Sequence, residues 1–322
     1  MAHLIEKMAY VGQTPWHHLG NQLPPKQSIE LWAEKAGMDW DITEAPVRYA
    51  TDPLDVGNSL KTFDEQKVLF RSDTKRPLSV VSGRYQVVQP RAVLEFYRDL
   101  TEISGYELET AGVLKEGRKF WALAKIGREA KLKGDDLVKG YLLLATSCDG
   151  TLATTATPTT IRVVCNNTLT MALDRANGAV KVPHSTKFDA GAVKARLGVA
   201  VAHWDEFMYR MKALSERAVK DEEASRFFLK VLCGTEGTPD PTQRLMNQRA
   251  LKRVHELYAG HGHGAELQSA KQTAWGLLNA VTEYVDHERR ARSQDHRLDI
   301  AWFGRGAVVK DRALEHALQL TA

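Results

Sequence analysis

The sequence predicts an α+β protein: an N-terminal part rich in antiparallel β-hairpins with packed helices, followed by a mostly helical C-terminal part. Segments in which β-branched and aromatic residues are dense dominate the first 180 residues. After Pro183 the apolar residues recur at helical spacing instead. Strands and helices are therefore segregated along the chain, which is typical of α+β folds and not of alternating, parallel α/β sheets.

The first elements are predicted from helix and turn signals. Residues 1–27 are expected to form an irregular arm, because Pro15 and Pro24–Pro25 interrupt regular structure. A short helix should follow, with Ser28 as its N-cap and Gly37 as its stop. Further strands and one helix that opens at Pro90 are then expected. These strands are predicted at 40–47, 67–69 and 78–88.

Two β-hairpins are the clearest structural prediction. The first has a turn with a glycine, Lys115–Gly117, and the second has Asp149–Gly150, the strongest short-range hairpin signal. Their strands are expected at 106–114, 118–126, 141–147 and 151–157. Pro158 should end or bulge the last of these strands.

The remaining chain is predicted to be mainly helical. A β-branched run at 160–165 precedes Asn166–Asn167, which can cap a helix over 168–175. Later helices are expected at 190–216, 220–233, 242–258, 268–292 and 309–320. The domain organisation expected from these elements is 1–27 (arm), 28–188 (α+β core) and 189–322 (helical region).

Composition and charge narrow the class of protein. Hydrophobic residues make up 43% of the 322 residues and charged residues 26%, which excludes a collagen-like or largely disordered chain. The three cysteines fit no zinc spacing or disulfide scaffold, and the chain has neither a long apolar span nor a secretory signal. We therefore expect a cytoplasmic protein without membrane contact.

The net charge of +4 is too small to indicate that the protein binds nucleic acid through its overall charge. A polyanion would have to bind at a local patch of basic residues.

Motifs for common cofactor chemistry are absent from the sequence. It contains no phosphate-binding P-loop, Rossmann fingerprint, zinc-protease helix or hydrolase elbow, so no cofactor is expected. His261 with His263, and Asp286–His287 with Asp295–His296, could instead bind a metal or act as a carboxylate–histidine site. A solvent loop and helix-capping or arginine-paired side chains explain the same residues. Cys165 beside Arg162 could have a lowered pKa, or it could be a buried, inert thiol.

Basic and aromatic residues interleave on the predicted strands. Lys119 and Trp121 share one face of a strand, where Lys119 could bind a phosphate and Trp121 could stack on a base. Alternatively, the strand is amphipathic, with Trp121 in the core and Lys119 at its solvent-exposed end. The hydroxyl-rich segment 154–167 suits phosphate-backbone contacts, although threonine also favours strands in general. The candidate nucleic-acid-binding residues are Arg84, Tyr85, Arg118, Lys119, Trp121, Lys125, Arg162, Asn167, Thr168 and Lys187.

Several motifs along the chain together resemble those of one known family. The matching segments are Pro15–Gly20, Ser82–Gln89, Glu109–Gly112 with Gly117–Arg118, Thr160–Leu169, Thr273–Gly276, Asn279–His287 and Trp302–Gly304. They span nearly the whole chain, are specific in combination, and resemble the phage/plasmid-like family called domain of unknown function 932. Members resemble accessory proteins of phages, plasmids and integrated elements, so the resemblance implies a bacterial cytoplasm and mobile-element DNA metabolism. One departure is Cys148, where the family often has a histidine before the Asp-Gly turn.

The leading hypothesis is a single-stranded DNA binding protein that anneals or recombines strands without nucleotide hydrolysis. Paired hairpins followed by a helix, at 106–175, resemble the core of phage annealing proteins of the Red-beta and RecT type. That likeness is one of topology alone. It implies a homo-oligomer, a ring or a filament, because unpaired edge strands can join copies.

Two other classes stay open from the sequence. The chain could be an enzyme, a metal-dependent nuclease or other hydrolase, if Asp149, Cys165, Asp286 and His287 converge in space. It could also be an anti-defence or regulatory module that binds a protein partner, which the modest net charge would suit. A non-enzymatic role is the expectation.

Overall fold

The computed structural model describes residues 7–12, 20–52, 54–164, 167–171, 179–234 and 241–321. The chain divides into two compact units that interleave in sequence. Unit 1 consists of Met1–Ile126, Leu142–Thr157 and Ala179–Leu197. Unit 2 consists of Gly127–Tyr141, Pro158–Gly178 and Gly198–Ala322. Both units therefore take segments from either side of residue 188, where the sequence suggested a boundary.

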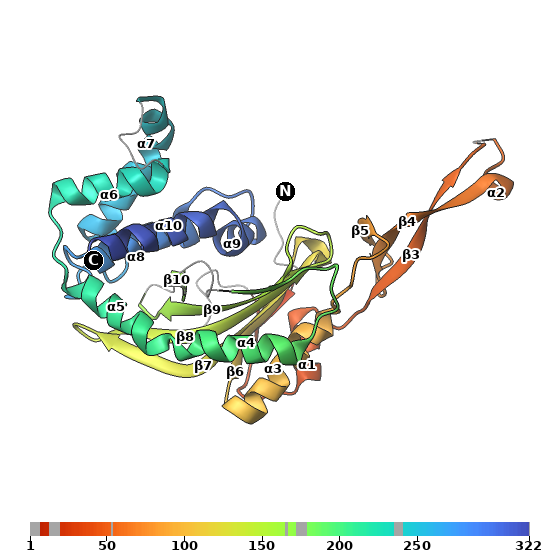
Figure 1. Cartoon of the computed structure of the whole chain (residues 1–322), viewed down its shortest axis with the longest axis horizontal. Helices are drawn as coiled ribbons and strands as arrows, with labels where there is room; N and C mark the ends of the chain where they lie inside the picture. Colours follow the sequence, from red (N-terminus) through yellow and green to blue (C-terminus); the bar gives the residue numbers. More distant parts are fainter. Residues whose placement is uncertain are drawn as a thin grey trace. The chain divides into compact units, whose positions relative to one another are not determined.

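The α+β class is confirmed, with strands concentrated in the first half and helices in the second (Figure 1). The strands are β1 (Lys7–Val11), β2 (Asn21–Leu23), β3 (Ile42–Ala50), β4 (Leu60–Arg71), β5 (Pro77–Ser82), β6 (Glu107–Leu114), β7 (Lys119–Leu132), β8 (Asp136–Ser147), β9 (Thr154–Arg162), β10 (Asn167–Thr170) and β11 (Val180–Val182). The helices are α1 (Ile29–Ala36), α2 (Val56–Ser59), α3 (Pro90–Ser104), α4 (Ala190–Ala202), α5 (Trp204–Glu216), α6 (Asp221–Cys233), α7 (Pro241–Glu256), α8 (Ala274–Glu283), α9 (Gln294–Phe303) and α10 (Arg305–Gln319). No helix of the described ranges is long and apolar enough to cross a bilayer.

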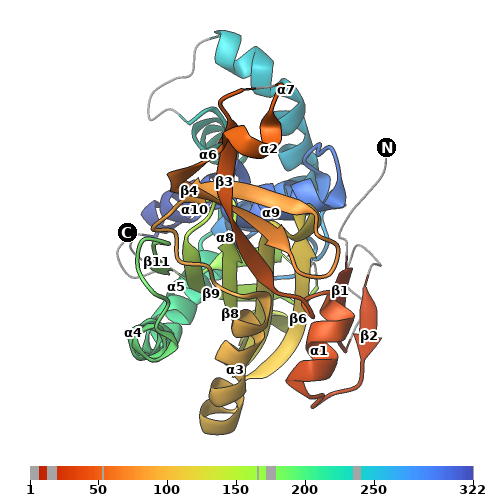
Figure 2. The same cartoon turned by 90° about the vertical axis from the view of Figure 1, so that its right-hand side faces the viewer.

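The strands form two sheets among the described residues. Eight of them make one sheet in the order β10-β9-β8-β7-β6-β1-β2, with β11 pairing beside β9, and β3-β4-β5 make a separate sheet of three. Both predicted hairpins are confirmed, because β6 neighbours β7 and β8 neighbours β9. The ribbon of β3 and β4 extends far from the rest of its sheet and carries α2 at its end (Figures 1 and 2).

The predicted helix over 28–37 is confirmed in detail. The Ser28 hydroxyl accepts a hydrogen bond from the Leu31 N–H (3.3 Å), and Gly37 ends the helix with a left-handed φ of 73°. Its buried face includes Trp32 and packs against β1. In the same unit, α3 is anchored by Tyr97, whose hydroxyl lies 3.0 Å from the Ala122 carbonyl oxygen and 2.8 Å from that of Leu142.

Unit 2 has its own apolar core. Buried side chains from α5, α6, α7, α8 and α10 meet there, among them Phe207, Phe228, Val254, Leu277 and Leu314. Each helix contributes residues at three- and four-residue spacing, which is the pattern the sequence showed. A fully buried leucine or phenylalanine contributes roughly 1.5–3 kcal/mol by leaving water, so this cluster suffices for an independent core.

Several predicted elements are wrong near the sheet. The arm of residues 1–27 contains two strands, since β1 pairs in parallel with β2 and antiparallel with β6, which buries Met8 and Ala9. The helix predicted over 168–175 begins as strand β10, because Thr168–Thr170 pair with β9; residues 172–178 lie outside the description. Pro158 does not end β9. It falls between the stretches that pair with β11 and β10, where a missing N–H interrupts neither ladder.

The helical half differs mainly in its boundaries. The helix expected over 190–216 is two helices, α4 and α5, with a turn at His203. The helix expected over 268–292 starts later, at the Thr273 cap, and ends in a π-helical turn at 284–288. Sequence periodicity missed α9, a helix capped by Ser293. The predicted helices at 220–233, 242–258 and 309–320 are confirmed within a few residues as α6, α7 and α10.

The turn between β6 and β7 depends on Gly117. Its φ is +98°, and a Cβ there would lie 3.0 Å from the Trp40 ring, which packs edge-on against Phe120 and face-on under Arg71. Only glycine combines this backbone conformation with this close approach.

We expect Gly117→Ala to lower the free energy of unfolding by more than about 2 kcal/mol, since left-handed strain of ~1–2 kcal/mol adds to crowding of ~1–3 kcal/mol. Gly127→Ala is the matched control: its φ is +69° but no atom lies within 4 Å of the added Cβ. Gly127→Ala should lower the free energy of unfolding only by the ~1–2 kcal/mol of left-handed strain. Urea unfolding measures both, and equal losses would contradict the crowding argument.

Candidate nucleic-acid interface

Within unit 1, the β8–β9 turn (residues 148–153) brings several predicted binding residues together. The Tyr85 hydroxyl donates to the Ser147 carbonyl oxygen at 2.7 Å, so the segment after β5 is fixed beside the turn. The Cys148 N–H donates to the Arg118 carbonyl oxygen at 2.9 Å, which brings in the start of β7. These bonds bring the segment of Arg84 and Tyr85 and the segment of Arg118, which are more than 30 residues apart in sequence, to one turn.

His184 joins a further segment to the same turn. Its Nδ1 lies 3.0 Å from the Gln86 carbonyl oxygen and its Nε2 lies 3.0 Å from that of Leu152. Both partners are acceptors, so only the doubly protonated imidazolium donates to both at once. The ring also stacks on Tyr85, with centroids 4.4 Å apart and planes 17° apart. His184 therefore joins its own segment to the turn and to the segment of Tyr85.

Four exposed cations lie on the segments that these contacts and the β9–β11 pairing join to the turn: Arg84, Arg118, Lys181 and Lys187. We call them the basic platform. None of the four takes part in an ion pair with any residue that the structure describes. The acid of the turn, Asp149, accepts hydrogen bonds from the Thr151 N–H (3.0 Å) and hydroxyl (2.6 Å). The platform thus keeps a local excess of positive charge that the overall composition conceals.

The other predicted contacts do not form this surface. Lys119, Trp121, Arg162 and Asn167 are buried, as is the Tyr85 ring. Strand β7 is covered on both faces from Lys119 to Ala124, so the expected distinction between a wet face and a core face does not hold. Lys125 is half-buried and ion-paired with Glu109 at 2.9 Å. We therefore do not retain these residues as direct phosphate or base contacts.

Arg162 instead belongs to a buried ionic cluster in unit 2. The Arg162 and Asp136 side chains are 2% and 0% exposed, and the Arg162 Nε lies 2.8 Å from Asp136 Oδ1. Asp136 Oδ2 also accepts from the Ser269 hydroxyl (2.7 Å) and from Trp275 Nε1 (2.9 Å). The remaining Arg162 nitrogens donate to the carbonyl oxygens of His263 and Gly264. Both charges are fully engaged within the protein, so this cluster is structural.

Thr168 and Asn167 contribute to neighbouring buried contacts in the same unit. The Asp286 carboxylate accepts from the Thr168 N–H (2.8 Å) and from Lys310 Nζ (2.7 Å), and that ammonium also donates to the Thr168 hydroxyl (2.7 Å). The Asn167 amide donates to the Asn279 carbonyl oxygen at 3.3 Å. Strand β10 is thereby bound to α8 and α10, where the sequence suggested a helix start open to DNA.

Two of the candidate metal and catalytic residues, His263 and Asp286, bind partners within the protein. His263 contacts the buried Glu283 through Nδ1 (2.6 Å), which fixes the loop before α8. Within the described ranges, no three His, Cys, Asp or Glu side chains are arranged to bind a metal. Of the suggested catalytic residues, Asp149 belongs to unit 1, Asp286 and His287 belong to unit 2, and Cys165 lies outside the described residues.

Cys148, the residue before the Asp149–Gly150 turn, is buried. Burial, with a smaller contribution from Asp149, raises the pKa of its thiol to about 12. The thiol lies 3.5 Å from the Gly117 carbonyl oxygen. It stays protonated at neutral pH, so it acts as a packed apolar group and not as a nucleophile.

Comparison with known proteins gives one match. A family model described as Domain of unknown function (DUF932) matches residues 77–302. The chain belongs to this family. No curated protein and no solved structure matches the chain. The family-like segments Thr160–Leu169, Thr273–Gly276 and Asn279–His287 contribute Arg162, Trp275 and Asp286 to these buried contacts.

Sequence reasoning missed the partners that hold this cluster. Asp136 follows Asp135 in a segment that looks like a turn, and Ser269 and Lys310 have no distinguishing pattern around them. The one available signal was an arginine in the middle of an apolar β-run, Ile161–Val164, since a buried cation needs a buried anion.

We expect Asp136→Asn to lower the free energy of unfolding by about 3–5 kcal/mol, because it leaves Arg162 buried and uncompensated. Arg162→Met should cost a similar amount, and the double variant should cost less than the sum of the two. Asp135→Asn is the control, because Asp135 forms an exposed ion pair with Lys131. This substitution should change the free energy of unfolding by no more than about 0.5 kcal/mol. Urea unfolding of the two single variants and the double variant measures these free energies. If the double variant lost the sum of the two single losses, the direct interaction between Asp136 and Arg162 would be contradicted.

Proposed function

We propose that the protein binds single-stranded DNA through the basic platform and promotes strand annealing or recombination. The observation that carries the proposal is the convergence of Arg84, Arg118, Lys181 and Lys187 around the β8–β9 turn, all exposed and without ion pairs in the described part of the chain. Guanidinium and ammonium groups bind phosphate oxygens through charge-assisted hydrogen bonds, and such contacts provide most of the sequence-independent affinity for DNA.

The geometry of the turn favours a preformed site over a flexible one. Tyr85 and His184 fix two segments to the turn through side-chain hydrogen bonds and ring stacking. Cations that are already positioned lose less conformational entropy on binding. The half-buried His184 ring lies on the same segment as Lys187 and is more exposed than Tyr85 and Trp121, so we assign base stacking to it in their place.

Annealing needs no nucleotide hydrolysis, and the sequence has no motif for it. We further propose that the protein acts as a homo-oligomer, a ring or a filament, in the DNA metabolism of a phage or mobile element. Membership of a family of unknown function is compatible with this role and adds no chemistry to it.

The test compares two triple variants in binding to a fluorescent single-stranded oligonucleotide over a range of salt concentrations. The platform variant is Arg84→Ala with Arg118→Ala and Lys187→Ala. It should bind more weakly, and its plot of log affinity against log salt should be flatter by about 2, since each lost phosphate contact removes ~0.7 from the slope.

The control removes the same charges from exposed positions in unit 2: Arg226→Ala, Lys230→Ala and Arg305→Ala. It should keep the wild-type slope. Equal losses in the two triple variants would mean that only net charge matters. No binding of the wild-type protein at low salt, or cleavage of the oligonucleotide, would overturn the proposal.

A further inference from the structure

The segment between the π-helical turn after α8 and helix α9 carries the densest run of arginines in the chain. Arg289, Arg290 and Arg292 lie within four residues, and no other stretch of four residues contains three arginines. Arg290 and Arg292 are exposed, and Arg289 is half-buried. We call residues 289–292, which belong to unit 2, the arginine loop.

The carboxylates that precede the arginine loop are paired with other cations. Glu288 Oε1 lies 2.6 Å from Arg253 Nη2, and Asp286 Oδ1 lies 2.7 Å from Lys310 Nζ. The sequence alone left open that the arginines of this segment neutralise such acids. Among the described residues, none of the three arginines of the loop forms an ion pair. The loop therefore keeps an excess of positive charge.

The backbone on both sides of the arginine loop is fixed. The Arg289 N–H donates to the Tyr284 carbonyl oxygen (2.7 Å), and Arg297 Nη1 donates to the Arg289 carbonyl oxygen (2.9 Å). Ser293 follows the loop directly and caps α9, since its hydroxyl accepts from the His296 N–H (3.1 Å). The two exposed arginines lie between these anchors, so little backbone order has to be gained when a ligand binds.

A half-buried tyrosine lies at the start of the loop. Burial raises the pKa of the Tyr284 hydroxyl, and the positive charge of Arg289 partly opposes that rise, so the two side chains are near each other. Proteins that bind single-stranded nucleic acids combine cations for the phosphates with aromatic rings for the bases. An acidic peptide would use only the charges. The pairing of arginines with a tyrosine therefore favours a nucleic acid as the ligand.

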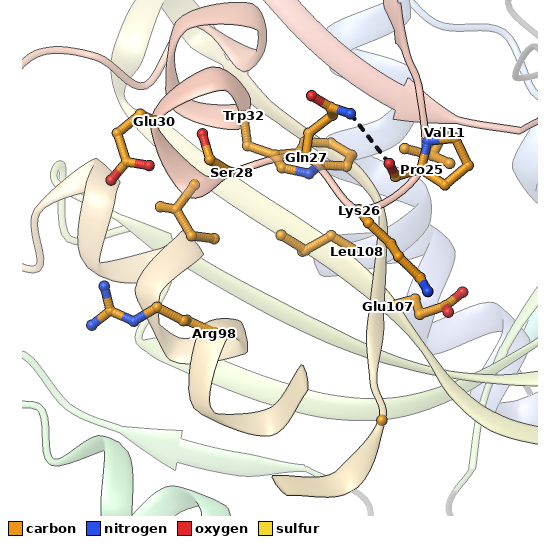
Figure 3. A pocket seen from close by; sticks show the side chains of 12 residues that line it. Val11, Pro25, Lys26, Gln27, Ser28, Glu30, Trp32, Arg98, Glu107 and Leu108 are labelled. Atoms are coloured by element: carbon orange, nitrogen blue, oxygen red, sulfur yellow. Dashed lines mark hydrogen bonds between the residues drawn. The ribbon is translucent and has the colours of Figure 1, made fainter. Parts of the chain in front are cut away.

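A groove in unit 1 lacks this excess of positive charge (Figure 3). Its volume is about 650 Å³, and two cations and two carboxylates are part of its lining: Lys26, Arg98, Glu30 and Glu107. Arg98 also has a partner within the protein. A lining with charges of both signs does not favour a polyanion, so the groove is not the site that we assign to phosphates.

We propose that the arginine loop is a second nucleic-acid site, at which Arg290 and Arg292 bind the backbone phosphates of a single strand. A guanidinium group matches two phosphate oxygens at once, which an ammonium group does not. The inference rests on the proposed function for its purpose, because annealing requires two strands to be held at the same time. The platform holds one strand and the arginine loop holds the other. The contact between the loop and phosphates does not itself depend on the platform.

The test measures binding of a fluorescent single-stranded oligonucleotide over a range of salt concentrations. For the loop variant, Arg290→Ala with Arg292→Ala, the plot of log affinity against log salt should be flatter by about 1.4, since each lost phosphate contact removes ~0.7. The matched control, Arg226→Ala with Lys230→Ala, removes two exposed cations from α6 and should keep the wild-type slope. Both variants should fold, because all four side chains are exposed.

Two further measurements separate phosphate recognition from charge alone. Arg290→Lys with Arg292→Lys should keep the wild-type slope but bind the oligonucleotide more weakly, because lysine cannot make the bidentate contact. Fluorescent polyglutamate of the same charge as the oligonucleotide should bind the wild-type protein and the loop variant equally. Polyglutamate binding that is as tight as that of the oligonucleotide and is lost in the loop variant would assign the loop to acidic peptides and contradict the proposal.

The platform variant distinguishes this inference from the proposed function. If the two sites are independent, adding the two loop substitutions to the platform variant should flatten its slope by a further ~1.4. A wild-type slope in the loop variant, beside a flattened slope in the platform variant, would overturn only the arginine loop. The reverse result would overturn only the platform. No binding of the wild-type protein at low salt would overturn both.

Discussion

The ion pair between Arg162 and Asp136 is the constraint on which unit 2 depends. Arg162 is the last residue of β9 and Asp136 the first of β8, so the pair closes the ends of two strands. Through Ser269, Trp275 and the carbonyl oxygens of the following loop, it also fixes the start of α8. Two charges removed from water cost several kcal/mol each unless every donor and acceptor is satisfied, and here the surrounding chain satisfies them.

This arrangement separates the residues that hold the fold from those that remain available to a ligand. Arginine and threonine in the hydroxyl-rich strand looked suited to a phosphate backbone, yet their partners are Asp136 and Asp286 inside the protein. The candidate cations that stay exposed lie around the β8–β9 turn of unit 1, where Tyr85 and His184 hold the segments together. The proposed contact with a polyanion therefore rests on the exposed cations around this turn and not on the buried residues of β9 and β10.

Much of the fold could be predicted from local signals. The Ser28 cap and the Gly37 stop fix α1, and the Asp149–Gly150 turn fixes the β8–β9 hairpin, because these signals act over a few residues. The partners of Arg162 and Thr168 could not be predicted, because Asp136 lies 26 residues before Arg162, and Gly264 and Asp286 lie 102 and 118 residues after Arg162 and Thr168. The exposure of Arg84, Arg118 and Lys187 follows from the same long-range packing that buries Lys119 and Arg162.

Hydrogen–deuterium exchange with and without single-stranded DNA, at one protein concentration, tests the central claim most directly. The account expects slower exchange on DNA binding in the four segments that carry or adjoin the platform, 83–87, 115–118, 147–153 and 181–187. Peptides that contain Asp136, Arg162 and Trp275 should exchange slowly with and without DNA, because these residues are buried and hydrogen-bonded within the protein. Protection confined to the helices after residue 198, or DNA binding with no change around the β8–β9 turn, would contradict it.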